Sequence, residues 1–181
     1  MKIRNGFVSN SSASSFVVAL NKKPSSVKEL KQILFGDDEK YSYPFEDQNH
    51  ADYEDEIWGT MNVASIVFND MKKKATKKEI FEVIRNGWFN DYPEFDYYAY
   101  SAIKEEEKDP EKALKLQQEF IKKLELETDK AAKKIMDRFL ETHSEKVFYI
   151  VSYSDNDGEL MCAMEHGNLF NRVPHLTISY H

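Results

Sequence analysis

A run of five apolar residues near the N-terminus constrains the fold of this chain more than any other feature. Residues 16 to 20 read Phe-Val-Val-Ala-Leu, and such a run has to be buried in a folded protein. Aromatic and β-branched residues dominate it, so we predict a strand over residues 14–20. Five serines lie between Ser9 and Ser15, at the entrance to this strand. Because the serine segment leads directly into a buried strand, we expect it to lie against the body of the protein.

The segment around these serines resembles a known sequence pattern. It reads Arg4-Asn5-Gly6-Phe7-Val8-Ser9-Asn10-Ser11-Ser12, then Ala13, then Ser14-Ser15-Phe16. This resembles the opening of a group of uncharacterised bacteriophage and bacterial proteins, in which NGFVSNSSSSSF precedes a strand and the chain often ends in a His-rich strand. Ala13 interrupts the serine run of that pattern. The resemblance implies a phage or mobile-element setting and carries no established activity.

The middle of the chain shows helical periodicity, and its end returns to strands. Helices are predicted from Ser25 or Ser26 to Phe35, over about residues 60–74, from Thr76 to Asn86, and from Asp109 to about Leu140. Strands are predicted over residues 147–151 and 176–180, whereas residues 160–170 fit either a strand or a short helix. The sequence therefore predicts a single α+β domain over residues 1–181. In this domain a small antiparallel sheet, built from N- and C-terminal strands, packs against a helical middle with one long helix.

Charge and cysteine content limit the classes of function. The net charge is −7, which argues against general nucleic-acid binding because that affinity comes from Lys and Arg neutralising phosphates. Cys162 is the sole cysteine, so an intramolecular disulfide is excluded and a reducing compartment is expected. No apolar run is long enough to span a bilayer, and no secretory signal is recognisable. We therefore expect a cytoplasmic protein without membrane association.

An acidic segment and an aromatic segment form the predicted binding surface. Residues 37–56 hold nine carboxylates and one lysine, and Pro44 indicates that they form an acidic loop or excursion. Residues 88–100 hold seven aromatic side chains, which are typical anchors of protein interfaces. The predicted contact residues are Tyr41, Tyr43, Phe45, Asp52, Glu54, Asp55, Glu56, Trp88, Tyr92, Tyr97 and Tyr98. They favour a protein partner with a basic surface. The alternative is that the aromatic residues fill the core and the acidic residues form a solvated rim.

No catalytic or metal-binding signature in the chain is complete. Asp155-Asn156-Asp157-Gly158 resembles part of a calcium loop, but Met164 stands where the closing Glu belongs. A Gly-x-Ser-x-Gly nucleophile elbow is absent from the sequence. We therefore interpret the chain as a non-catalytic accessory protein of the phage or mobile-element type that binds another protein and uses no cofactor.

A ligand- or metal-binding enzyme is the alternative interpretation. Alternation along the terminal strand places His175 and His181 on one face. Imidazole and carboxylate are ligands of Zn²⁺, Mn²⁺ or Fe²⁺, although two residues six apart on a strand are separated by about 20 Å. The residues that this interpretation assigns to the metal are Glu165, His166 and His175. The competing interpretation is a solvent-facing strand with incidental histidines.

The serine segment would complete that alternative site. Its hydroxyls and closely turned backbone N–H groups suit an anion. The predicted ligand-binding residues are Arg4, Ser9, Asn10, Ser11 and Ser12. Two further roles stay open for this segment: the hydroxyls satisfy the backbone of their own turn, or Ser11 or Ser12 is covalently modified.

Overall fold

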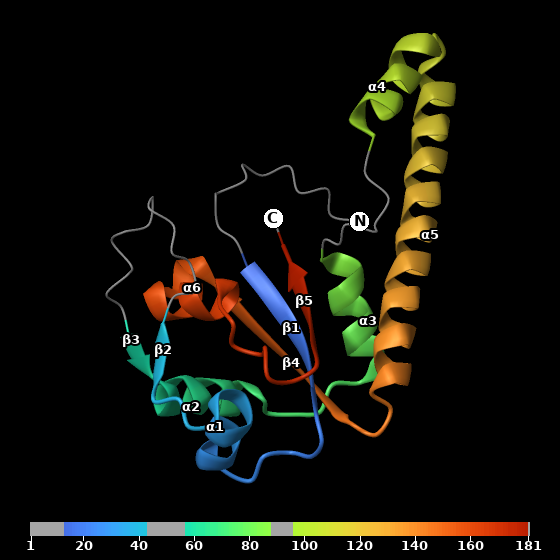
Figure 1. Ribbon diagram of the computed structural model, residues 1–181. Helices are drawn as coiled ribbons and strands as arrows, with labels where there is room; N and C mark the ends of the chain where they lie inside the picture. The colour runs from blue at the N-terminus through green and yellow to red at the C-terminus, as the bar shows by residue number, and fades with distance from the viewer. Residues whose placement is uncertain (1–12, 43–56, 88–95, 181) are drawn as a thin grey trace.

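The computed structural model describes residues 13–42, 57–87 and 96–180 (Figure 1). At its centre lies a three-stranded antiparallel sheet with the strand order β4-β1-β5. The strands are β1 (Ala13–Leu20), β4 (Val147–Ser154) and β5 (His175–Ser179). The strand near the N-terminus thus lies between two strands from the C-terminal part of the chain. This arrangement, together with the helical middle, confirms the predicted α+β fold.

The central position of β1 explains why its sequence is continuously apolar. Phe16 pairs with Val151 on β4 and with Thr177 on β5, so both edges of β1 are occupied. Every residue from Ser14 to Leu20 is buried, because helices also cover both faces of the sheet. A strand that is buried on both faces needs a continuous apolar run, whereas the edge strands can alternate.

One face of the sheet is covered by α1 (Val27–Phe35), α2 (Thr60–Asp70) and α6 (Glu159–His166). A short hairpin of β2 (Lys40–Ser42) and β3 (Ile57–Gly59) joins this layer beside α2. Buried side chains of this core include Phe16, Leu20, Leu30, Val63, Val67, Tyr149, Met164 and Phe170. Removal of their apolar surface from water is the main force that holds this layer on the sheet.

The other face is covered by α3 (Lys77–Asn86) and the C-terminal half of α5 (Pro110–Thr142). Their core consists of Val17, Ala19, Ile80, Ile84, Ala132, Met136, Phe139 and Ile178. Gly87, directly after α3, lets the chain pass close to β5. A Cβ atom at this position would lie 1.9 Å from Ile178 Cγ2, so any larger residue would push the two elements apart.

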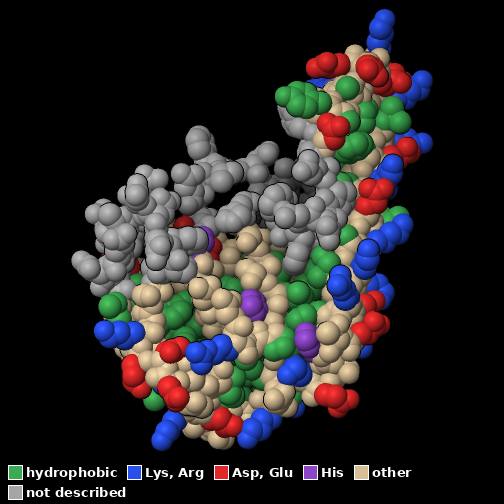
Figure 2. Space-filling view, viewed as in Figure 1, with side chains coloured by type: hydrophobic (Ala, Val, Ile, Leu, Met, Phe, Trp, Pro, Cys, Tyr) green, Lys and Arg blue, Asp and Glu red, His purple; other side chains and the backbone are tan. Residues whose placement is uncertain are grey.

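The helix α4 (Tyr97–Glu106) and the N-terminal half of α5 form a helical hairpin that projects from the body (Figure 1). Gln117 Nε2 donates a 3.2 Å hydrogen bond to the Tyr100 carbonyl, and the rings of Tyr100 and Phe120 lie 6.1 Å apart. Figure 2 shows acidic and basic side chains spread over this hairpin, with hydrophobic side chains among them. Neither of these helices, nor any other helix in the described ranges, has the length and apolarity needed to cross a membrane.

Capping residues set the helix boundaries at the predicted places. At the start of α1, Ser26 Oγ accepts a 3.2 Å hydrogen bond from the Glu29 N–H. Thr76 and Glu79 form a complete capping box at the start of α3. Asp109 caps α5, which has proline in its first turn. The three helices predicted from these caps are therefore confirmed.

Several segments differ from the sequence-based expectation. Within the predicted loop 37–56, Lys40–Ser42 form β2, because Tyr41 turns into the core while its neighbours face solvent. The helix predicted over residues 60–74 ends at Asp70. The aromatic segment contains the first residues of α4, and the ambiguous segment 160–170 contains most of α6.

Candidate functional site

A row of polar groups crosses the sheet at the N-terminal end of β1, where the serine segment enters the strand. Ser14 pairs with Tyr153 on β4 and with Ser179 on β5, so these three side chains lie on one face. Helix α6 covers this row, and Ser14 Oγ donates a 3.5 Å hydrogen bond to Glu165 Oε1. The structure therefore places Glu165, a predicted site residue, beside the strand that the serine segment enters.

Glu165 is unusual because its carboxylate is completely buried. The side chain is 0% exposed, and the imidazole Nε2 of His166 lies 3.8 Å from Oε2. Within the described residues, Oε2 accepts no hydrogen bond. A buried carboxylate is costly unless it is paired and hydrogen-bonded. Glu165 is thus a candidate position for a bound cation, with Ser14 and His166 as its described polar neighbours.

His175, the third predicted metal ligand, lies elsewhere on the sheet. It pairs with Val18, four positions along β1 from Ser14, which is a separation of about 13 Å. Its ring packs 6.4 Å from Phe16, and its Nδ1 lies 3.0 Å from the Val173 carbonyl. The described ranges contain no group of three or more His, Cys, Asp or Glu side chains placed to hold a metal ion. Glu165 and His166 are brought together, and His175 is not.

The buried tyrosines Tyr41 and Tyr153 lie on the same side of the sheet as the polar row, and Tyr153 belongs to it. Tyr41 donates a 2.8 Å hydrogen bond to the Ala163 carbonyl, and burial raises its pKa. The Tyr153 hydroxyl faces the Asp70 carboxylate without a hydrogen bond of normal geometry. Burial first, and then the charge of Asp70, raise the pKa of Tyr153. Both hydroxyls therefore stay protonated over the ordinary pH range and contribute to the structure rather than to proton transfer.

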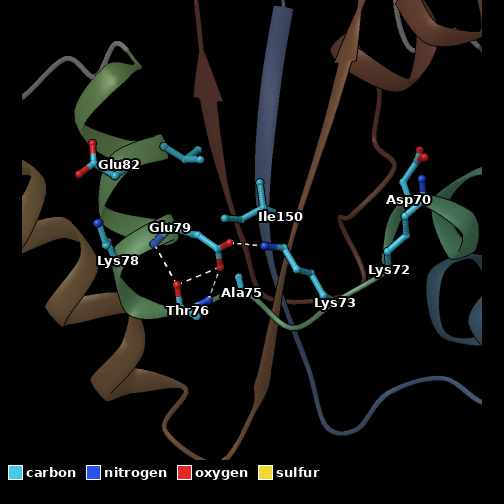
Figure 3. Close-up of a pocket in the computed structure, with 10 residues that line it drawn as sticks. Asp70, Lys72, Lys73, Ala75, Thr76, Lys78, Glu79, Glu82 and Ile150 are labelled. Atoms are coloured by element: carbon cyan, nitrogen blue, oxygen red, sulfur yellow. Dashed lines mark hydrogen bonds and ion pairs between the residues drawn. The ribbon is translucent and has the colours of Figure 1, made fainter.

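A groove of about 730 Å³ lies along the outer edge of β4 (Figure 3). We call it the β4 groove. Asp70 and Lys72 lie on its α2 side, Glu79 and Val83 on its α3 side, and Ile150 of β4 between the two. The linker after α2 passes from one face of the sheet to the other at this edge, because α2 and α3 cover opposite faces. The groove is therefore bounded by a helix on each side and by the edge of the sheet.

The backbone of β4 directs hydrogen-bonding groups outward along this edge. The Ala75 N–H donates a 2.8 Å hydrogen bond to the Phe148 carbonyl, so the backbone of Phe148 points away from β1. These directions alternate along an antiparallel strand, so the N–H and C=O groups of Ile150 and Ser152 point outward as well. No described residue forms a hydrogen bond with them. The linker thus occupies the edge at Phe148, and the next two outward positions have no hydrogen-bond partner among the described residues.

Ion pairs hold the α3 side of the β4 groove in place. Glu79 pairs with Lys73, and its Oε2 accepts a 2.9 Å hydrogen bond from the Thr76 N–H. The Lys73 ammonium first, and then the bonds from Thr76, lower the pKa of Glu79 to about 2. Because Lys73 belongs to the linker and Glu79 to α3, this pair ties the linker to the start of the helix (Figure 3).

Most residues of the predicted acidic and aromatic surface lie outside the described ranges. They are Tyr43, Phe45, Asp52, Glu54, Asp55, Glu56, Trp88 and Tyr92. The predicted ligand-binding residues Arg4, Ser9, Asn10, Ser11 and Ser12 lie outside them too. Of the remainder, Tyr41 is buried in the core, Tyr97 begins α4, and Tyr98 is 85% exposed on the projecting hairpin. The acidic surface therefore stays a prediction.

Sequence patterns alone did not identify the β4 groove. The available signal is the run Lys72-Lys73-Lys74-Ala75-Thr76-Lys77-Lys78, which holds five lysines where one predicted helix ends and the next begins. Its importance depends on where the linker crosses the sheet, and no local pattern specifies this crossing. No protein-family model, curated protein or solved structure matches this chain. Functional conclusions therefore rest on the arrangement of its own residues.

Proposed function

We propose that this chain is a non-catalytic protein-binding module that takes up an extended segment of a partner as an additional strand beside β4. One observation carries the proposal: the backbone groups of Ile150 and Ser152 point outward from β4 with no described partner, and Ile150 lines a groove between two helices. In this binding mode the backbone hydrogen bonds supply affinity, and the walls of the groove select the side chains. Such a module suits the phage or mobile-element setting that the opening segment implies. That setting stays a prediction.

The lining of the β4 groove supports an extended peptide as the occupant. Ala75, Val83 and Ile150 offer apolar surface between the charged side chains of the two walls. Side chains alternate on a strand, so an added strand would direct one set toward α3 and the other toward the end of α2. Ala75 already bonds the edge at Phe148, and a bound segment would continue this pairing along Ile150 and Ser152.

The edge can be blocked at Ser152 without removing a core side chain. Ser152 is exposed, and proline is tolerated on edge strands where the N–H faces outward. We expect Ser152→Pro to weaken binding about tenfold, because it removes an outward donor and places a ring at the edge. The measurement is the enrichment and affinity of displayed random decapeptides selected on the wild-type protein.

Ser152→Ala is the matched control. It removes the 2.6 Å contact between the hydroxyls of Ser15 and Ser152, as the proline variant also does, but it keeps the backbone N–H. We expect it to bind the selected peptides as the wild type does. If circular dichroism shows that Ser152→Pro is unfolded, Val83→Trp provides a second block, because the indole fills the groove from α3. Peptides that bind the wild type and both blocking variants, Ser152→Pro and Val83→Trp, equally would refute strand addition at β4.

A cation-binding site at Glu165 is the second candidate function. The supporting observation is its fully buried carboxylate, with one oxygen that accepts no hydrogen bond from a described residue. This candidate retains Glu165 and His166 from the predicted metal set. The Glu165→Gln variant tests this candidate together with a metal measurement, because a bound cation would make the buried charge stabilising and would be lost with it.

A further inference from the structure

A cluster of lysines borders the β4 groove in a chain that is acidic as a whole. Five of the seven residues from Lys72 to Lys78 are lysine, whereas the net charge of the chain is −7. All five lysine side chains are exposed. Lys72, Lys73 and Lys78 line the groove itself, and Lys77 lines a neighbouring hollow of about 320 Å³. The proposed docking edge therefore carries a local cluster of basic charge.

The carboxylates that line the same groove each have a basic neighbour. Glu79 pairs with Lys73. The Asp70 carboxylate interacts with the charge of Lys72. Glu82 lies near Arg85 on the same helix and interacts with its guanidinium. These pairs leave little uncompensated negative charge on the walls of the groove.

Three lysines of the cluster form no ion pair with a described residue, although Asp137 and Glu141 line the same hollow as Lys77. Among the described residues, no carboxylate oxygen lies within 4 Å of the ammonium groups of Lys74, Lys77 or Lys78. Lys77 and Lys78 also lie in the first turn of α3, where the positive end of the helix dipole disfavours a cation. Their positions are thus unfavourable for the free protein and become favourable when negative charge is bound nearby.

We propose that the segment that binds beside β4 is an acidic extended peptide, with Asp or Glu side chains placed toward Lys78 in the groove and toward Lys74 and Lys77, which are next to groove-lining residues in the sequence. This inference rests on the proposed strand addition and specifies the partner. The edge of β4 supplies hydrogen bonds that any extended backbone can use. The lysine cluster then selects for carboxylates, and electrostatic attraction raises the rate at which acidic segments reach the groove.

The composition of the selected peptides tests this inference apart from the proposed function. Random decapeptides displayed on phage are selected on the wild-type protein and counter-selected on Ser152→Pro. We expect the edge-dependent peptides to be enriched in Asp and Glu, and their affinity to fall as salt is raised from low to physiological concentration. Edge-dependent peptides without acidic enrichment would refute the acidic partner but keep strand addition. The absence of edge-dependent peptides would refute both.

Charge reversal of the cluster provides the second test. We expect the triple variant Lys74→Glu, Lys77→Glu, Lys78→Glu to bind an enriched acidic peptide at least about tenfold more weakly, because three exposed charge pairs are lost. Glu is favourable in the first turn of a helix, so the variant should fold. The matched control is Lys112→Glu, Lys115→Glu, Lys123→Glu on exposed positions of α5, which changes the net charge equally. Equal weakening by both variants would refute a local role of the cluster.

A single-stranded oligonucleotide is the competing polyanion. We expect a fluorescein-labelled thymidine oligonucleotide to bind far more weakly than the enriched peptide at physiological salt, because it lacks a peptide backbone for the edge of β4. Oligonucleotide binding that matches the peptide and is unaffected by Ser152→Pro would overturn the proposal, since the lysines would then act as a phosphate-binding surface.

Discussion

At the scale of single residues, Glu165 is the side chain whose environment fits a simple core least well. It lies on α6 and faces β1, and its one hydrogen bond from a described side chain is the long contact with Ser14. His166 lies at the limit of an ion pair with it and is itself half-exposed. The sequence places Glu165 among candidate residues only through its histidine neighbour, and its burial follows from the helical turn of α6, which the pattern left ambiguous.

The substitution Glu165→Gln keeps the shape of this side chain and removes its charge. If Glu165 is only structural, we expect the variant to be more stable by on the order of 1 kcal/mol, because the cost of burying a charge disappears. Thermal unfolding at neutral pH measures this change, and Glu159→Gln at the exposed start of α6 serves as the control. A less stable variant, together with metal that elemental analysis finds in the wild type alone, would instead support the cation site.

At the scale of elements, local signals specified the capped helices α1, α3 and α5, whereas tertiary pairing specified the short strands. Caps at Ser26, Thr76 and Asp109 were readable because each depends on a few neighbouring residues. The strand β2 could not be predicted from its own sequence, because its three residues form a strand only by pairing with Ile57–Gly59 later in the chain. Helix α6 was ambiguous because an apolar run of this length fits either period.

The capping box of α3 makes part of the stability dependent on pH. The pKa of Glu79 in the folded protein is lowered to about 2, chiefly by Lys73. A lowered pKa means that this contribution is complete above the ordinary pKa of Glu and is lost as the pH falls toward 2. Glu79→Gln keeps the acceptor for Thr76 but removes the charge. We expect its melting temperature to lie modestly below that of the wild type at pH 6 and to converge with it near pH 2.

Glu119→Gln is the control for this titration, because Glu119 is exposed on α5 and forms no ion pair with a described residue. Its melting temperature should follow that of the wild type over the whole range. A difference between Glu79→Gln and the wild type that persists unchanged at pH 2 would contradict the role assigned to the charge.

At the scale of the whole molecule, the helices differ in how much of the body supports them. The C-terminal half of α5 packs on the sheet through Ala132, Met136 and Phe139. Its N-terminal half, among the described residues, packs against α4 away from the sheet (Figure 1). The helical period of α5 predicted its length well, but a period cannot tell which half of a helix will meet a sheet.

Hydrogen exchange should reveal this difference in support. We expect the amides of β1 to exchange slowest, because they open only when the sheet is disrupted. Amides of α4 and of the first turns of α5 should exchange much faster, since the hairpin can open without exposing either core. Mass spectrometry of proteolytic fragments after deuterium labelling measures both regions in one sample. Equal protection of the two regions would show that the hairpin is stabilised by contacts beyond those described.

The central position of β1 has a consequence for biosynthesis. Its Ser15 contacts Ser152, 137 positions later, and both flanking partners of β1 come from that distant part of the chain. The ribosome therefore releases the most apolar strand long before anything can pair with it. During this interval the nascent polypeptide exposes an apolar segment that is prone to aggregation. We therefore expect the yield in the cell to depend on how well β1 is shielded until translation reaches the final strands.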